Sequence, residues 1–131
     1  WLSMTAVVAG VPMGASHAIG HILGGTCDVP HGYTSCIMLP TVLRWNAEED
    51  MHRERQKIIA EAFGKPGEPA GDVVHEFIDG LGLPRSLSAV CVGPDNYHLV
   101  AKNRLQDRRL HTNPRKVNGI DDILTLLNMA A

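Results

Sequence analysis

The sequence predicts an all-α fold in a single domain. Three observations support this prediction: apolar residues recur at three- and four-residue spacing, glycines and prolines separate those segments, and no alternating polar and apolar run lasts beyond a few positions. Ser88–Val92 is the one weak candidate for a strand. At 131 residues, with 44% hydrophobic and 20% charged residues, the chain has the size and composition of one soluble globular domain.

The N-terminal third of the chain holds almost no charge. The sequence has 12 basic and 14 acidic residues, but residues 1–43 contain only Asp28, and the other 25 follow from Arg44 onward. This uncharged run could be considered as a membrane span, but a proline, five glycines, two histidines and three hydroxyl residues before position 26 make it too polar. We therefore expect a helix buried on most sides, whose glycines and alanines let neighbouring backbones approach closely.

Two apolar helices are expected in this part of the chain. The first spans residues 2–23, with a bend or interruption at Pro12, because proline removes a backbone donor and clashes with the preceding turn. The glycine pair at positions 24 and 25 is expected to end it. The second helix lies within residues 32–46, with Pro40 as a kink or boundary.

Two amphipathic helices are expected to follow. Asn46 is the predicted N-cap of the first, because an acid, Glu49, follows three residues later, and this helix ends at Gly64. Apolar residues repeat at three and four positions over residues 73–81, between two prolines, which predicts the next helix and its end near residues 80–82.

Two more helices complete the predicted fold. The run Gly93-Pro94-Asp95 is typical of a helix start, because proline suits the first turn, and the apolar side of this helix extends to Leu105. Asn118 is the predicted cap of the last helix, with Asp121 at the third position. The apolar face of that helix leads to the C-terminus.

Cysteine content and charge exclude several classes of protein. The three cysteines, Cys27, Cys36 and Cys91, are odd in number and lack a Cys-x-x-Cys spacing, so we expect reduced, buried thiols in a cytoplasmic compartment. The net charge of −2 is spread over interleaved acids and bases, which gives no indication of nucleic-acid binding. No signal peptide is evident, and a chain that opens at Trp1 is expected for a piece of a longer polypeptide.

Three histidines, His17, His21 and His31, stand in an apolar, glycine-rich stretch whose only charge is Asp28. Imidazole is polar and titrates near neutrality, so three of them here indicate more than packing. His17 and His21 lie four residues apart, on one face of the predicted helix, and His31 follows a short loop that lets it fold back. Three interpretations fit this pattern. His17 and His21 could both bind one metal ion, or one of them could bind it while the other acts on the substrate. The histidines could also have a purely structural role.

The other histidines and the known catalytic motifs carry less information. Four histidines stand among charged residues and are expected to face solvent: His52, His75, His98 and His111. The last of them precedes a loop, residues 112–115, that could approach a site. The sequence contains no His-Glu-x-x-His, Gly-x-Ser-x-Gly, Walker or Gly-x-Gly-x-x-Gly motif, so it shows no nucleotide-binding element.

Residues 16–25 and 29–46 closely resemble the signature of the iron-containing alcohol dehydrogenases, a family that includes the maleylacetate reductases. The resemblance rests on features that recur together: His17 and His31 fourteen residues apart, His21 between them, Pro30-His31-Gly32, Leu39-Pro40 and a closing Asn46. Residues 113–115, Asn-Pro-Arg ahead of a leucine-rich helix, resemble the C-terminal segment of the family.

The resemblance implies a metal site shared by this chain and an upstream part. In the family one aspartate and three histidines bind the metal; His17 and His31 match the last two ligands, whereas the other two would lie upstream of Trp1. His21 matches a catalytic, non-ligand histidine beside the metal and the nicotinamide, where it would orient substrate or relay a proton. Asp28 is expected as an exposed turn residue between the ligands.

The fold and cofactors implied by the resemblance are those of a two-domain enzyme. Residues 1–131 would form the single all-helical, metal-binding C-terminal domain of a dehydroquinate synthase-like fold, and the N-terminal nucleotide-binding domain is absent from this chain. The expected cofactors are a divalent metal, Fe(II) or in some members zinc, and NAD or NADP, bound mainly by the missing domain.

The function implied is hydride transfer between NAD(P) and a small alcohol or aldehyde, with the fragment inactive alone. Residues 23–31 lean towards the maleylacetate reductases, whereas the spacing of the histidines favours the metal-dependent alcohol dehydrogenases. A second hypothesis is a non-catalytic helical fragment that only self-associates. We expect a cytoplasmic homo-oligomer that binds neither nucleic acid nor membrane, with an exposed apolar surface where the missing domain would dock.

Overall fold

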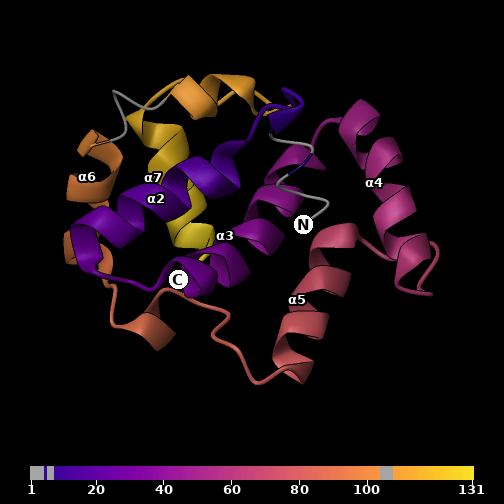
Figure 1. The fold of residues 1–131 in the computed structure, drawn as a ribbon, viewed down its shortest axis with the longest axis horizontal. Coiled ribbons are helices and arrows are strands. Elements are labelled where there is room, and N and C mark those ends of the chain that lie inside the picture. Colours follow the sequence, from indigo (N-terminus) through magenta and orange to yellow (C-terminus); the bar gives the residue numbers. More distant parts are fainter. Residues whose placement is uncertain (1–4, 6–7, 104–107) are drawn as a thin grey trace.

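The computed structural model describes residue 5 and residues 8–103 and 108–131, and the regular structure among them is helical throughout (Figure 1). The described elements, in chain order, are α2 (Ala15–Cys27), α3 (His31–Asn46), α4 (Asp50–Ala62), α5 (Ala70–Gly80), the 3₁₀ helix η1 (Ser88–Val90), α6 (Pro94–Asn103), the 3₁₀ helix η3 (Arg108–Thr112) and α7 (Ile120–Met129). The all-α prediction is confirmed.

The core forms around the contact between α2 and α3. In Figure 1, α6 and α7 lie on one side of these two helices, and α5 packs against α3 on the other side with α4 beyond it. Most of the largest side chains buried in the core come from four of these helices, α2, α3, α6 and α7: Ile19, Leu23, Ile37, Met38, Val100, Ile123, Leu126 and Leu127. Leu87 and Val92, on either side of η1, join them. Burying each such side chain contributes about 1.5–3 kcal/mol, so the four helices hold one another in place.

The first predicted helix is interrupted before α2, with helical residues at positions 5 and 8, and it extends further than expected at its C-terminal end. Residues 1–4 and 6–7 of the prediction lie outside the described residues, and the backbone at 11–14 is not helical, which confirms an interruption at Pro12. Helix α2 then runs through the glycine pair, which was expected to end it, and stops where Asp28 adopts a left-handed conformation with φ of 55°. The buried face of α2 outweighs the low helix propensity of its glycines.

Pro40 lies inside α3, and the helix continues past it to Asn46, so the predicted helix boundary at Pro40 is wrong. Pro40 and its neighbours Ile37 and Thr41 are buried, and the packing of this face outweighs the one backbone hydrogen bond that proline removes. Helix α5 approaches α3 closely at this level, because a Cβ on Gly71 would lie 2.9 Å from the Pro40 carbonyl oxygen. Glycine is therefore required at position 71 for the two helices to pack.

Both predicted asparagine caps are wrong. Asn46 is the last residue of α3, and Glu49, whose side chain makes no capping bond, precedes α4. Gly119, not Asn118, precedes α7, and the carboxylate of Asp122 reaches back to accept the backbone N–H of Asn118 at 2.8 Å. The bond therefore runs opposite to the predicted cap, because the first turn of α7 supplies the acceptor and residue 118 supplies the donor.

The remaining expectations concern the segment after α5. The weak strand candidate at residues 88–92 is wrong: Ser88–Val90 form a 3₁₀ turn, and Cys91 follows with φ of 60°. Helix α6 begins at Pro94 as predicted, whereas Leu105 lies outside the described residues. Among the described helices none is both long enough and apolar enough to cross a bilayer.

Candidate metal centre

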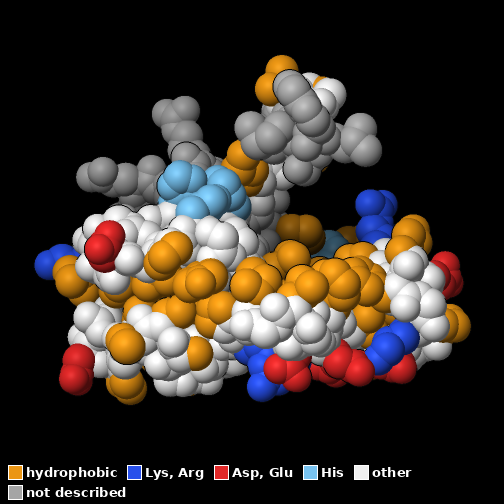
Figure 2. Space-filling model, turned by 60° about the horizontal axis from the view of Figure 1, so that its bottom comes forward, with side chains coloured by type: hydrophobic (Ala, Val, Ile, Leu, Met, Phe, Trp, Pro, Cys, Tyr) orange, Lys and Arg blue, Asp and Glu red, His pale blue; other side chains and the backbone are white. Residues whose placement is uncertain are grey.

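The structure brings the three histidines of the apolar stretch together on one surface (Figure 2). The ring centroids of His17 and His21 are 4.5 Å apart, and the ring of His31 lies 5.2 Å from the first and 5.1 Å from the second. One ligand atom from each side chain lies within 4.8 Å of the other two. The short loop after α2 therefore folds His31 back onto the helical pair, as the spacing predicted.

A close contact between α2 and α3 sets this arrangement. His17 and His21 project from α2, and His31 is the first residue of α3. Between the two helical histidines, Gly20 faces Thr34, and a Cβ on Gly20 would lie 2.9 Å from the Thr34 hydroxyl oxygen. That hydroxyl donates a 2.9 Å hydrogen bond to the carbonyl oxygen of His31. The absence of a side chain at position 20 thus brings the start of α3 next to α2.

The donor set fits a divalent transition metal. Imidazole nitrogen is a common ligand of zinc and iron, with metal–nitrogen distances of about 2.0–2.1 Å for zinc, so two nitrogens on one tetrahedral ion lie about 3.4 Å apart. The nitrogens of His17, His21 and His31 are already within 4.8 Å, and small side-chain rotations would bring them to that separation. His17 is half-buried, whereas His21 and His31 are exposed, so the cluster is open on one side.

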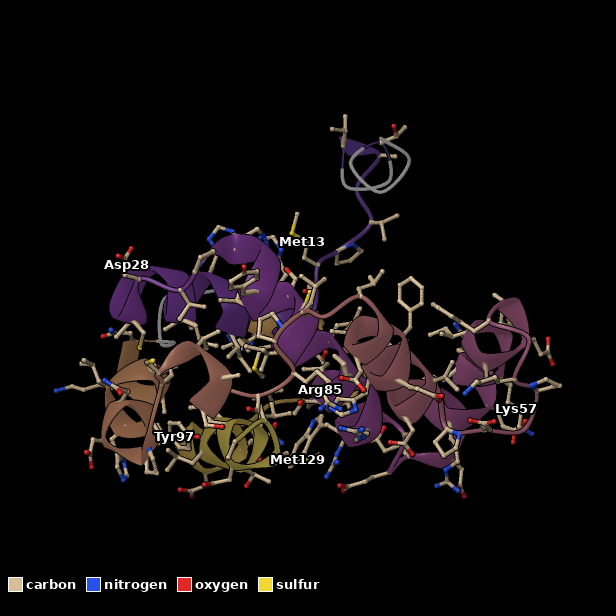
Figure 3. All side chains as sticks on the ribbon, turned by 90° about the horizontal axis from the view of Figure 1, so that it is seen from below. Met13, Asp28, Lys57, Arg85, Tyr97 and Met129 are labelled. Carbon is tan, nitrogen blue, oxygen red and sulfur yellow. The ribbon has the colours of Figure 1, made fainter. Side chains whose placement is uncertain are left out.

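Asp28 is an exposed residue in the turn between α2 and α3. It follows the last residue of α2, is exposed, and lies at the outer end of that helix in Figure 3. The expectation of an exposed turn residue is confirmed for Asp28. Its left-handed backbone conformation, which aspartate tolerates better than most residues, reverses the chain towards α3.

The other four histidines differ in exposure. His98 and His111 are exposed as expected. His52 is half-buried and contacts the carboxylate of Glu49 at 3.1 Å. His75 is also half-buried; burial and then the charge of the nearby arginines lower its pKa below the ordinary value of 6.5. The prediction of solvent-facing side chains is therefore wrong for His52 and His75, because helix packing covers part of each ring.

Asn113 anchors the N-terminus of the histidine-bearing helix, a role that sequence reasoning missed. Its side-chain oxygen accepts the N–H of Ala15, the first residue of α2, at 3.1 Å. Its side-chain nitrogen donates to the side-chain oxygen of Asn46 at 2.7 Å and to the carbonyl oxygen of Arg115 at 2.6 Å. The sequence offered one indication of this role: residues 113–115, Asn-Pro-Arg, resemble the C-terminal segment of the family and precede the last helix.

Arg115 completes this connection between the C-terminal loop and α3. Its guanidinium carbon lies 3.5 Å from the ring centroid of Trp45, and the group also donates to the Trp45 carbonyl oxygen at 2.8 Å. A further bond of 2.6 Å reaches the carboxylate of Glu48. A planar guanidinium can stack and donate in this way at once, which a lysine cannot reproduce.

The three cysteines are free, in agreement with the expectation of reduced thiols. Cys27 and Cys36 are half-buried, and burial raises the pKa of the Cys27 thiol. Cys91 is exposed, so the expectation of a buried thiol is wrong at that position. The left-handed backbone at Cys91 lies in a surface turn, where its side chain has no core to enter.

The fold and the site define the chain as an all-helical domain that carries a candidate three-histidine metal centre. Residues 2–131 match the family model described as the Fe-containing alcohol dehydrogenase family, C-terminal. The chain belongs to the Fe-containing alcohol dehydrogenase family and covers the C-terminal domain of that family. This confirms the resemblance drawn from residues 16–25, 29–46 and 113–115.

Relatives and solved structures agree with this assignment. The dehydrogenase FUM7 of Gibberella moniliformis is 34% identical over 91% of this chain and 32% of the relative. The maleylacetate reductase of Pseudomonas aeruginosa is 32% identical over 99% of this chain and 35% of the relative. The structure of an alcohol dehydrogenase from Oenococcus oeni superposes with a TM-score of 0.76 and 29% identity, covering 90% of this chain and 32% of that one. The chain thus spans about a third of the relatives' length and belongs to a family of oxidoreductases.

Proposed function

We propose that this chain is the metal-binding helical part of an NAD(P)-dependent oxidoreductase that acts on a small alcohol or aldehyde. The observation that carries the proposal is the cluster of His17, His21 and His31 on one surface, with ligand atoms within 4.8 Å of one another. Membership in the Fe-containing alcohol dehydrogenase family supports it. Alone, without the nucleotide-binding part, the chain is expected to be inactive.

The roles proposed for the histidines follow the resemblance to the family, in which His17 and His31 match ligands and His21 matches a non-ligand histidine. His17 and His31 would hold a divalent ion, Fe(II) or zinc, together with ligands outside this chain. When bound, such an ion polarises a carbonyl or alkoxide oxygen, and the nicotinamide donates or accepts the hydride. His21, which matches the non-ligand histidine of the family, is exposed, and its ring would orient the substrate or accept and return the proton of the alcohol hydroxyl.

A second candidate activity is that of a maleylacetate reductase. The relative of that name from Pseudomonas aeruginosa matches 99% of this chain, from one end to the other, at 32% identity. Its substrate would carry carboxylates, whereas a simple alcohol would not. Steady-state kinetics of the full-length protein on a small primary alcohol and on maleylacetate would distinguish the two.

The experiment that tests the proposed roles uses the complete enzyme. We expect His17→Ala and His31→Ala to lower metal content and turnover together, because each removes a ligand. His21→Ala is expected to lower turnover while metal is retained. His98→Ala, an exposed histidine on α6, is the matched control and should change neither quantity. Unchanged metal content in both ligand variants would overturn the assignment.

A non-catalytic helical fragment is the alternative from another class. A purified 131-residue chain that folds stably but binds neither metal nor NAD(P) would support that alternative. Under either proposal we place the protein in the cytoplasm, because its three thiols are free.

We also propose that the chain forms homo-oligomers through an apolar groove between α3, α4 and α5. The groove has a volume of about 420 Å³, and apart from Ser35 its lining residues are apolar. Four of its large side chains are 42–57% exposed: Leu39, Phe63, Phe77 and Leu81. Figure 2 shows hydrophobic side chains gathered in a broad band below the histidine cluster. In a purified solution only a second copy of the chain is present to cover this surface.

A further inference from the structure

We propose that the pocket between α3, α5 and the end of α7 binds a small oxyanion, the chemical group of a carboxylate or phosphate ligand. The pocket has a volume of about 490 Å³. Its basic side chains are Arg44 from α3, His75 from α5 and Arg85 from the loop that follows α5. None of them belongs to the histidine cluster, so this proposal does not rest on the proposed function.

One face of α5 arranges the charged groups at this pocket. Asp72, His75 and Asp79 follow one another at three- and four-residue spacing and therefore share one side of the helix. The Nε–H of Arg44 donates to the Asp72 carboxylate at 2.7 Å, and Nε of Arg85 lies 3.1 Å from the carboxylate of Asp79. The two guanidinium groups are thus held one turn before and one turn after His75.

Close packing sets the course of the Arg44 side chain. A Cβ on Gly71 would lie 2.6 Å from Cγ of Arg44, so the stem of this arginine lies directly against α5. In Figure 3 the labelled Arg85 and Met129 lie near each other, where the loop after α5 passes the end of α7, and both residues line the pocket. Side chains that are already held in place lose little further conformational freedom when they bind a ligand.

Each arginine keeps most of its hydrogen-bond donors for a ligand. Both carboxylate contacts are made through Nε, and within the part of the chain that the structure describes no hydrogen bond involves the terminal nitrogens of Arg44 or Arg85. The terminal N–H groups of a guanidinium lie in one plane and match two oxygens of a carboxylate or phosphate. The arginines can therefore bind an oxyanion without giving up their ion pairs.

The balance of charge around His75 also favours an anion. Burial is the first cause that lowers the pKa of His75; the charges of Arg44 and Arg85 come next, and the carboxylates of Asp79 and Asp72 oppose them less strongly. The positive charges therefore outweigh the negative ones at this ring. A bound oxyanion would offset the arginine charges, and it would raise the pKa of His75.

The test is a titration of the full-length protein with inorganic phosphate and, separately, with succinate, each followed by calorimetry. We expect Arg85→Gln to lower the affinity about tenfold or more, because it removes charge-assisted hydrogen bonds. Arg53→Gln is the matched control, since Arg53 is also exposed and paired with an acid, Asp50, but lies outside the pocket. Circular dichroism checks the fold, and Arg85→Lys replaces Arg85→Gln if the latter does not fold. The tighter of the two anions shows whether the site prefers phosphate or carboxylate.

The NMR signal of the His75 ring supplies a local readout, which separates this pocket from an anion site elsewhere in the full-length protein. We expect the bound anion to raise the pKa of His75 in the unaltered protein but not in Arg85→Gln, and His75→Gln assigns the signal. A His75 pKa that neither anion changes overturns the proposal. So does an Arg85→Gln protein that binds both anions as tightly as the unaltered protein. Neither measurement depends on metal content or hydride transfer, so the proposed function stands or fails separately.

Discussion

The side-chain amide of Asn113 donates a 2.7 Å hydrogen bond to the side-chain oxygen of Asn46, and both side chains are buried. The same amide accepts the N–H of Ala15. The last residue of α3 and the first of α2 are therefore joined through one side chain from the C-terminal loop. Both of these helices carry histidines of the candidate metal centre.

Asn113→Ala is expected to lower the free energy of unfolding by about 2–4 kcal/mol, because it leaves a buried acceptor on Asn46 and a buried N–H on Ala15 without a partner. Urea denaturation followed by circular dichroism measures this. Asn128→Ala is the control, because Asn128 is exposed and its amide donates a hydrogen bond to the Leu124 carbonyl oxygen of its own helix. Equal effects of the two substitutions would contradict the anchoring role of Asn113.

Gly20→Val is expected to weaken metal binding without touching a histidine. The added side chain must displace Thr34, whose hydroxyl oxygen would lie 2.9 Å from the new Cβ, and the start of α3 would shift away from α2. Overpacking of this kind costs about 1–3 kcal/mol of stability. Co²⁺ titration and thermal unfolding measure the two effects.

Gly25→Val, on the same helix, is the matched control for Gly20. Among the described residues, no atom outside its chain neighbours and its own helix backbone lies within 4 Å of a Cβ placed at position 25, so the substitution has room. It should leave metal affinity unchanged. If it lowered affinity as much as the change at position 20, the close contact with Thr34 would not be what positions His31.

The lowered pKa of His75 predicts that the free energy of unfolding falls as the pH drops below 6.5, the ordinary pKa of histidine. Burial lowers the pKa of His75 in the folded chain, Arg44 and Arg85 lower it further, and the nearby carboxylates of Asp79 and Asp72 oppose the shift. Because the unfolded chain then binds a proton more readily, the contribution of His75 is present above pH 6.5 and is lost as the pH falls towards the folded pKa.

Urea denaturation between pH 7.5 and about pH 5 tests this expectation for His75. His75→Gln should flatten part of the decline in the free energy of unfolding, whereas His98→Gln, at an exposed position, should not. The same slope in the unaltered chain and in His75→Gln would show that His75 does not contribute.

The apolar groove predicts concentration-dependent association of the purified chain. Phe77 is 50% exposed and contacts Phe63 with ring centroids 5.1 Å apart. Phe77→Glu should shift sedimentation towards the monomer, because a carboxylate in the interface loses its hydration without a partner. Leu99→Glu, a position 50% exposed on α6 and outside the groove, should leave the distribution unchanged. A chain that stays monomeric at all concentrations would contradict the association.

Most helices could be predicted from local patterns. The apolar repeat of residues 73–81 corresponds to α5, Pro94 begins α6, and the face of α7 buries Ile123 and Leu127. These features depend on residues three or four positions apart, which a helix brings to one side whatever the rest of the chain does. The proximity of the three histidines was predictable for the same reason, because two share a helix face and one follows a short loop.

Contacts between distant segments decided the rest. Asn46 has the sequence context of a helix cap, yet its amide pairs with Asn113, which lies 67 positions away, so α3 runs on to include it. Pro40 stays within a helix because the packing around it outweighs one lost hydrogen bond.

The sequence by itself determined which segments of the chain form helices and which histidines can meet, because both follow from spacing along one segment. The tertiary structure alone decided where the helices end, how closely α2 approaches α3 at Gly20, and that His21 lies as near to both other rings as they lie to each other. The physical reason is that close packing and buried hydrogen bonds depend on partners that only the folded chain brings within reach.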